Sequence, residues 1–270
     1  FAIYEYEMTE THTGMGTVST ATVNCGDDYT YMIDADTANG YHIESVTFNG
    51  VTTTYGNNED IHAEQLVEAV SQDTTIDVVF AINTYSIDVT VNGNGTTTPG
   101  DTAGIIWDTN VDYTITAEHG YHIASVLADG VNVFTPSSDP NIDSLFNYSF
   151  TNIRENHTLV VNFATNIYTI IASADSEGTI VMPGENHVAY NNNIDFTITA
   201  NGCYHISAIL IDGVESVIFD DNTSYYVFTF ENVEADHTIH ATFAINTYTI
   251  HAAAGANGTI VSGDTVLEHG

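Results

Sequence analysis

Histidines are the residues whose type and spacing first suggest chemistry, because imidazole binds metal ions and transfers protons near neutral pH. Three of them recur in a Tyr-His-Ile motif, as His42, His122 and His205, at spacings of 80 and 83 residues. One histidine in each distant copy cannot form a shared metal site, so we expect packing or hydrogen bonding at a sheet surface. His237 and His240 lie three residues apart, which on a strand directs their side chains to opposite faces. Zinc is disfavoured.

Acidic loops are the better metal candidates, since calcium prefers carboxylate oxygens. Asp139 and Asp143 lie in one such loop, and Asp220 and Asp221 lie in another. Neither loop has the spacing of an EF-hand or of a nonapeptide calcium repeat. Solvated turns are therefore the alternative, and calcium is the one cofactor that the sequence suggests.

Catalytic motifs are absent from the sequence. It contains no Gly-x-Ser-x-Gly elbow, no phosphate-binding loop and no His-Glu-x-x-His. Because lysine is missing, Schiff-base catalysis and Lys–Asn isopeptide cross-links are chemically excluded. We expect a protein that is not an enzyme, with no catalytic residues.

The two cysteines stand at positions that are not equivalent. Cys25 aligns with Trp107 and Tyr190, whereas Cys203 aligns with Gly120. We expect Cys25 to be a buried free thiol, and a bridge within the chain would have to skip one repeat. An interchain disulfide is the remaining alternative.

The charge balance excludes several classes of partner. The chain has 36 Asp and Glu residues against the single basic residue Arg154, giving a formal net charge of −35. Such a surface repels nucleic acid and anionic lipid. Hydrophobic residues make up 43% of the chain, enough for packed cores, and no apolar run is long enough for a transmembrane helix. We expect no direct membrane insertion and an extracellular, protease-exposed location.

A repeat of about 80 residues organises the chain. Its marker phenylalanines are Phe1, Phe80, Phe163 and Phe243, spaced by 79, 83 and 80 residues. We predict a closing strand of a preceding repeat in residues 1–4, three repeats in 5–82, 83–164 and 165–245, and the start of a fourth in 246–270. We expect these ends to be those of a window cut from a longer array, with a processed mature protein as the alternative.

Each repeat is predicted to contain six short strands. Period-two alternation, as in residues 85–91 and 113–117, indicates half-buried strands, and Asn-Gly or Asp-Gly turns indicate hairpins. Residues 60–70 have a weaker pattern, and we expect them to be extended by analogy with the other copies. The fold class is therefore all-β, a tandem array of small antiparallel sandwich-like repeats end to end. The linkers lack Gly and Pro, which predicts stiff coupling.

One further pattern suggests a family. The segments Phe196-Thr197-Ile198-Thr199-Ala200, Phe230-Glu231-Asn232-Val233 and His237-Thr238-Ile239-His240-Ala241-Thr242-Phe243-Ala244 follow one another in the third repeat, and similar segments cover the whole chain. This order resembles the divergent internalin-B-type repeats of bacterial surface and secreted proteins. The resemblance implies a spacer, stalk or adhesin arm.

Two function classes follow from the sequence. The first is a structural protein of an extracellular filament, stalk or adhesin arm on a prokaryotic cell surface, with self-association through strand complementation between subunits. The second is a module array that binds a glycan or a surface receptor through the loops 132–147 and 215–224, with Tyr225 and Tyr226 as the aromatic pair. Candidate glycosylation sequons lie at Asn94, Asn147, Asn156, Asn222 and Asn257.

Overall fold

The structure is a computed structural model that describes residues 3–220, 222–260 and 265–269. It contains two compact units. The first comprises residues 1–116, 123–135 and 145–162, and the second comprises 117–122, 136–144 and 163–270. The regular structure of the described residues consists of strands and two short 3₁₀ helices, which confirms the all-β class.

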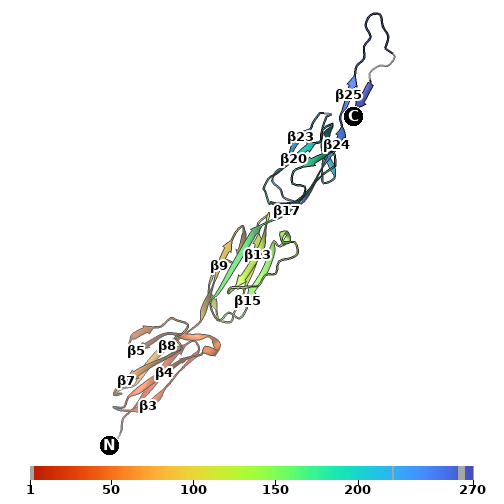
Figure 1. The fold of residues 1–270 in the computed structure, drawn as a ribbon. Coiled ribbons are helices and arrows are strands. Elements are labelled where there is room, and N and C mark those ends of the chain that lie inside the picture. The colour runs from red at the N-terminus through yellow and green to blue at the C-terminus, as the bar shows by residue number, and fades with distance from the viewer. Residues whose placement is uncertain (1–2, 221, 261–264, 270) are drawn as a thin grey trace. The chain divides into compact units, whose positions relative to one another are not determined.

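The first repeat contains eight strands in two sheets, of which β3, β4, β5, β7 and β8 are labelled in Figure 1. Their order is β3-β1-β8-β5-β6 in the larger sheet and β2-β4-β7 in the smaller. The elements are β1 (Glu5–Thr13), β2 (Gly16–Val18), β3 (Ala21–Asn24), β4 (Tyr29–Ala35), the 3₁₀ helix η1 (Thr37–Asn39), β5 (Tyr41–Phe48), β6 (Val51–Thr54), β7 (His62–Val67) and β8 (Thr74–Ile82).

The second repeat has the same strand order, β11-β9-β16-β13-β14 and β10-β12-β15. Its elements are β9 (Thr84–Asn92), β10 (Gly95–Thr98), β11 (Thr102–Ile106), β12 (Val111–Ala117), β13 (Tyr121–Ala128), β14 (Val131–Asn132), the 3₁₀ helix η2 (Pro140–Ile142), β15 (Leu145–Phe150) and β16 (His157–Thr165).

The third repeat follows the order β19-β17-β24-β21-β22 and β18-β20-β23, and a two-stranded hairpin, β25-β26, comes after it. The strands are β17 (Ile167–Ala174), β18 (Gly178–Ile180), β19 (Gly184–Ala189), β20 (Ile194–Ala200), β21 (Tyr204–Ile211), β22 (Val214–Ile218), β23 (Tyr225–Phe230), β24 (His237–Ile245), β25 (Thr247–Ile250) and β26 (Thr265–Glu268). Three successive copies of one topology confirm the tandem repeat.

The core of the first repeat lies between its two sheets. Tyr31 and Ile33 of β4 are fully buried against Ile43 of β5 and Ile76 and Val78 of β8. Along β4 and β8 these residues alternate with exposed ones, as the period of two requires. Burying each large aliphatic side chain contributes roughly 1.5–3 kcal/mol.

Two features differ from the six-stranded prediction. Each repeat has two additional strands, exemplified by β3 and β6, which are short edge strands and have little apolar alternation of their own. One pair in each large sheet is parallel, namely β1 with β8, β9 with β16 and β17 with β24. Alternation does not encode strand direction. The extended conformation expected for residues 60–70 is confirmed by β7.

Candidate functional site

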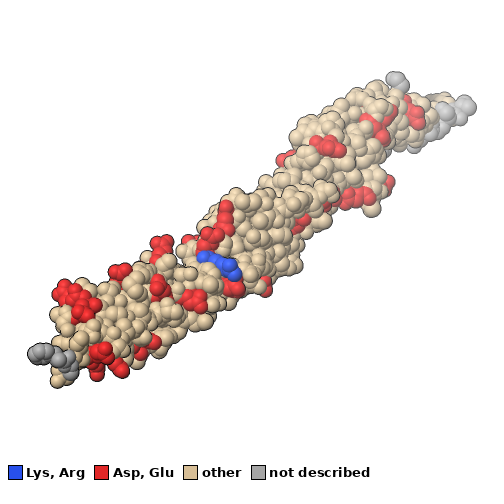
Figure 2. All heavy atoms as spheres, turned by 90° about the horizontal axis from the view of Figure 1, so that it is seen from below, with Lys and Arg blue, Asp and Glu red and all other residues tan. Residues whose placement is uncertain are grey.

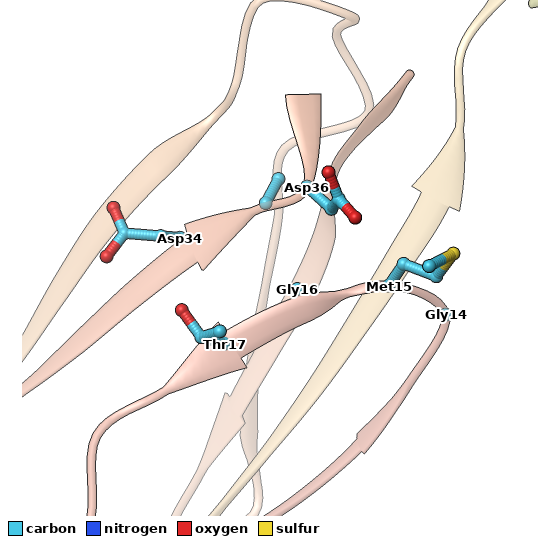
Figure 3. Close-up of a pocket in the computed structure, with 7 residues that line it drawn as sticks. Gly14, Met15, Gly16, Thr17, Asp34 and Asp36 are labelled. Carbon is cyan, nitrogen blue, oxygen red and sulfur yellow. The ribbon is translucent and has the colours of Figure 1, made fainter. Parts of the chain in front are cut away.

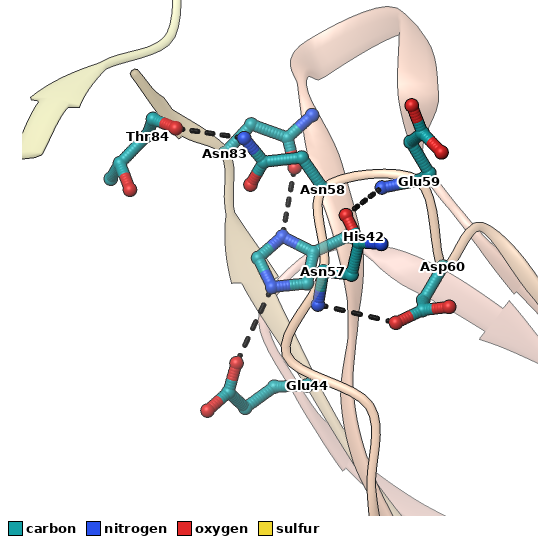
Figure 4. A network of polar contacts seen from close by, with 8 residues as sticks. All are labelled: His42, Glu44, Asn57, Asn58, Glu59, Asp60, Asn83 and Thr84. Carbon is teal, nitrogen blue, oxygen red and sulfur yellow. Dashed lines mark hydrogen bonds and ion pairs between the residues drawn. The ribbon is translucent and has the colours of Figure 1, made fainter. Parts of the chain in front are cut away.

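The linker between the first two repeats is a single residue, Asn83, which lies between β8 and β9. Its N–H donates to the carbonyl of Gly40 at 2.7 Å, and its own carbonyl accepts from the N–H of Trp107 at 3.0 Å. Its Oδ1 accepts from Nδ1 of His42 at 2.8 Å, and Nε2 of that ring lies 3.3 Å from Glu44 Oε2 (Figure 4). Asn83 is 7% exposed, so these bonds replace lost water.

A second contact fixes the first residue after each of the first two linkers. Asn58 Nδ2 donates to the carbonyl of Thr84 at 2.7 Å, as Figure 4 shows. At the next linker, Asn141 Nδ2 donates to the carbonyl of Ile167 at 2.8 Å while its Oδ1 accepts from the Ile167 N–H at 3.2 Å. Both asparagines lie in the loop that follows the hairpin turn. This loop therefore clamps the next repeat.

The linker bonds recur at the two later linkers, which both lie in the second unit. The Asn166 N–H donates to the Gly120 carbonyl at 2.9 Å, and the Asn166 carbonyl accepts from the Tyr190 N–H at 2.9 Å. Oδ1 of Asn166 lies 2.9 Å from His122 Nδ1. The Asn246 N–H donates to the Cys203 carbonyl at 2.8 Å, and the Asn246 carbonyl accepts from the His269 N–H at 2.9 Å. Oδ1 of Asn246 lies 3.0 Å from His205 Nδ1. The recurring histidines are thus hydrogen-bonded to the linker asparagines, and His42 and His205 are buried there.

An aromatic ring packs against a bare glycine beside each of the first two linkers. Gly40 and Gly120 have φ of 74° and 82°, in the left-handed region. A Cβ on Gly40 would collide with the indole of Trp107, and one on Gly120 would collide with the ring of Tyr190. Glycine is needed at these two positions for both its backbone conformation and its missing side chain.

The cysteines occupy these same junction positions. Cys203 stands in place of the glycine, with φ of 78°, and its Sγ lies 3.8 Å from Nε2 of His269. Cys25 stands in place of the aromatic residue, and its N–H donates to the Tyr4 carbonyl at 2.8 Å. The prediction of a buried Cys25 is wrong, because it is an exposed free thiol. Its counterparts Trp107 and Tyr190 pack on the preceding repeat, not in their own core.

The single cation of the chain lies beside the first linker. Arg154 donates from Nε and Nη2 to Asp108 Oδ1 at 3.0 and 2.9 Å. Its guanidinium lies 5.0 Å from the ring centre of Trp107, in cation–π range. Figure 2 shows one blue side chain with red carboxylates around it. Trp107 is therefore held between Gly40 and Arg154.

The Asp-Gly turns form a second recurring site. Asp129 accepts hydrogen bonds from His157 Nδ1 at 2.7 Å and from the Thr158 N–H at 2.8 Å. Asp212 does the same with His237 Nδ1 at 2.8 Å and the Thr238 N–H at 2.8 Å. In the first repeat the turn residue is Asn49, at φ of 49°. The aspartates thus link each turn to the start of the last strand of its repeat.

These contacts shift the titration of both aspartates. The hydrogen bond from His237, followed by the Thr238 N–H, holds the pKa of Asp212 below its ordinary value. For Asp129, burial alone would raise the pKa, but the Thr158 N–H and His157 outweigh it, so the pKa is lowered. Both carboxylates are about half exposed, with 49% and 50% of the side-chain surface accessible, so solvent screens their effect on stability.

The calcium candidates act as turn acceptors. The bonds are from the Asn141 N–H to Asp139 (3.0 Å), the Ser137 N–H to Asp143 (2.8 Å) and the Thr223 hydroxyl to Asp220 (3.2 Å). Asp221 lies outside the described residues. Within the described part of the chain, no group of three or more His, Cys, Asp or Glu side chains is arranged to hold a metal ion.

A groove of about 390 Å³ lies between residues 14–17 and 34–36 of the first repeat (Figure 3). Its two carboxylates are engaged separately. Asp34 Oδ1 lies 2.6 Å from His62 Nδ1, and this bond raises the pKa of His62. Asp36 caps η1 through the Asn39 N–H at 3.2 Å. The two carboxylates therefore do not form a joint acid–base pair.

The predicted aromatic pair is split by the pleat of β23. Tyr225 is 61% exposed, whereas Tyr226 packs edge-on against Phe219 with ring centres 4.8 Å apart. Only Tyr225 is available to a ligand on that face. The sequon asparagines are all exposed: Asn94, Asn147, Asn156, Asn222 and Asn257.

No protein-family model and no curated protein matches the sequence. Among solved structures, a tandem of titin domains is 11% identical, with 91% of this chain and 99% of that chain covered and a TM-score of 0.17. The Bacillus anthracis TIE protein is 9% identical over 95% of this chain, which spans 61% of that protein, with a TM-score of 0.30. The Bacteroides ovatus glucan-utilization protein SGBP-B, solved with a mixed-linkage heptasaccharide, is 10% identical (84% and 77% covered, TM-score 0.16). Likeness of this degree leaves the function of the chain open.

Among the described residues, no helix is long and apolar enough to cross a membrane.

Proposed function

We propose that this chain is a non-enzymatic spacer: a stalk, filament or adhesin arm of an extracellular protein on a prokaryotic cell surface. The observation that supports the proposal is the repeated linker site, in which one buried asparagine bonds to the repeat before it and to the repeat after it. A linker of one residue that is held by these bonds has little conformational freedom left. Successive repeats then behave as one stiff element. The resemblance to internalin-B-type repeats supports the same role.

Small-angle scattering on a series with one, two and three repeats tests this proposal. The maximum dimension is expected to rise by a constant increment for each repeat and to change little with salt. A maximum dimension that stays constant as repeats are added would contradict the spacer role. The double substitution Asn83→Gly/Asn166→Gly in the whole chain is expected to broaden the distance distribution, since it removes both side-chain bonds and adds backbone freedom.

Self-association by strand pairing is a second proposal, supported by one observation. β25 pairs with β26 in a two-stranded sheet, whereas its counterparts β1, β9 and β17 each also pair with a parallel strand. Among the described residues no strand pairs with β25 on the side away from β26, and a strand supplied by a second copy would fit there. Light scattering after size-exclusion chromatography over a concentration series provides the test. A monomer at every concentration would contradict self-association and leave the spacer role untouched.

A further inference from the structure

A polar pocket of about 390 Å³ lies inside the first unit, at the linker between the first two repeats. Its lining comes from the loop after the Asn-Gly turn, from β9 and from the segment before β16: Asn57, Asn58, Tyr85, Arg154, Glu155 and Asn156. Its size is within the range of small-ligand sites. We propose that this pocket binds a neutral oligosaccharide.

Its hydrogen-bonding groups are only half used by the protein. Asn57 Oδ1 accepts from the Glu59 N–H at 3.2 Å, and Asn156 Oδ1 accepts from the Ser86 N–H at 2.9 Å. Within the described residues, Nδ2 of both asparagines and Nη1 of Arg154 have no partner. One bond fixes the Asn57 side chain, and two bonds each fix Asn156 and Arg154, while these remaining donors are available to a ligand.

Acceptors lie among these donors. The carboxylates of Glu59 and Glu155 line the pocket and make no hydrogen bond among the described residues, and Asn58 uses its Nδ2 but not its Oδ1. A sugar hydroxyl both donates and accepts, so alternating donors and acceptors suit adjacent hydroxyls better than they suit a uniformly charged group. The half-buried ring of Tyr85 supplies an apolar face for the C–H side of a pyranose.

The local charges favour a neutral ligand over an anionic one. Arg154 is already paired with Asp108, and the two glutamates leave the pocket with a negative balance. The whole chain carries −35 and adds to the repulsion of phosphate, sulfate or uronate groups.

The equivalent positions of the third repeat show that these residues are not required by the fold. Glu234 stands where Arg154 is, Asp236 stands where Asn156 is, and Pro140 replaces Asn57 at the second linker. Asp236 Oδ1 accepts from the Thr169 N–H at 2.7 Å, as Asn156 does from Ser86. Asp is therefore tolerated structurally at that position, and the free amide donors are a property of the first linker.

The test is a fluorescence titration of the intact chain. Trp107 is its single tryptophan and contacts Arg154, so occupation of the pocket changes its emission. The probes are maltotriose, cellotriose and laminaritriose, with trigalacturonate as the acidic comparison. At least one neutral trisaccharide is expected to bind at up to about 10 mM, and trigalacturonate is not.

Asn57→Asp/Asn156→Asp keeps both structural acceptors and removes both donors, and it is expected to weaken binding by at least about tenfold. Asn132→Asp/Asn193→Asp is the matched control, because those Oδ1 atoms also accept backbone N–H bonds, at 3.2 and 2.8 Å, and the added charge is equal. This control is expected to bind as the original chain does. No binding of any neutral trisaccharide, preference for trigalacturonate, or equal affinity of the two double variants would overturn the proposal. None of these results bears on the spacer role.

Discussion

Trp107 packs its indole on the bare α-carbon of Gly40, and the two residues belong to successive repeats. The same relationship joins Tyr190 to Gly120. Each ring is also tied by its backbone N–H to the linker asparagine, so packing and hydrogen bonding act on the same residue.

Gly40→Ala is expected to destabilise the first linker by displacing Trp107 from its contact with residue 40. The Ala side chain suffers both the left-handed backbone, which costs about 1 kcal/mol, and a collision with Trp107, which costs about 1–3 kcal/mol more. Gly50→Ala is the matched control, since Gly50 has φ of 75° and nothing lies within 4 Å of its built Cβ. Urea unfolding followed by Trp107 emission compares the two. Equal losses of stability with unchanged emission in both variants would contradict the packing role of Gly40.

The His42–Asn83 hydrogen bond is expected to contribute about 1 kcal/mol of coupling, because both partners are buried and each leaves an unpaired group when the other is removed. A double-mutant cycle with His42→Ala and Asn83→Ala measures it. The exposed hydroxyl pair of Thr47 and Thr52, 2.8 Å apart, serves as the comparison and is expected to couple more weakly. A coupling energy no larger than that of the threonine pair would show that His42 does not stabilise the linker.

Stability is expected to fall at acidic pH because of the Asp-Gly turns. The pKa values of Asp129 and Asp212 are lowered in the folded state. The stabilisation is therefore present above their unfolded pKa of about 3.9 and is lost as the pH falls through the lower folded value. Asp129→Asn/Asp212→Asn is expected to lose about 1 kcal/mol at pH 7 and to flatten the acid limb of the profile.

Urea unfolding from pH 7 to pH 3 measures this effect. Asp88→Asn on the exposed face of β9 is the control and is expected to retain the acid limb. An acid limb in the double variant as steep as that of the original chain would show that other carboxylates carry the effect.

Tyr31 is expected to limit stability at alkaline pH. Burial, with a smaller effect from Tyr29, raises its pKa to about 12. Its contribution is complete below the unfolded pKa of about 10 and is lost as the pH rises from there through the folded value, on the order of 2 kcal/mol. Tyr31→Phe is expected to cost about 1 kcal/mol at pH 8, because the hydroxyl donates to the Thr74 carbonyl at 2.9 Å, and to lessen the alkaline decline.

Chemical denaturation at pH 8 and pH 11 provides the comparison, with Tyr225→Phe as the exposed control. If Tyr31→Phe retains the whole alkaline decline, then another tyrosine is responsible for it.

The sequence predicts the parts of the fold that depend on local order. The Asn49-Gly50 and Asp129-Gly130 turns and the alternation in residues 113–117 define hairpins and strands that the structure contains. Strand direction and the pairing of β1 with β8 depend on contacts between the two ends of a repeat. Alternation along one strand carries no information about such contacts.

The linker site is less accessible to sequence reasoning. Its histidines recur visibly, but their partner Asn83 looks like an ordinary residue between two strands. The alignment of Cys25 with Trp107, and of Cys203 with Gly120, is readable from the sequence. The alignment does not reveal that the glycine position of one repeat contacts the aromatic position of the next repeat, as Gly40 contacts Trp107. The aromatic position therefore lies outside the core of its own repeat, and Cys25, which occupies it, is exposed.

Hydrogen exchange at the Asn83 amide tests the linker most directly, since this N–H donates across the junction to the Gly40 carbonyl. Residue-resolved exchange in the intact chain is expected to give Asn83 and Asn166 protection within about tenfold of core amides such as Val78. If both linker amides exchange as fast as the exposed turn amide of Gly50, the repeats are loosely tethered and the account of a stiff array is wrong.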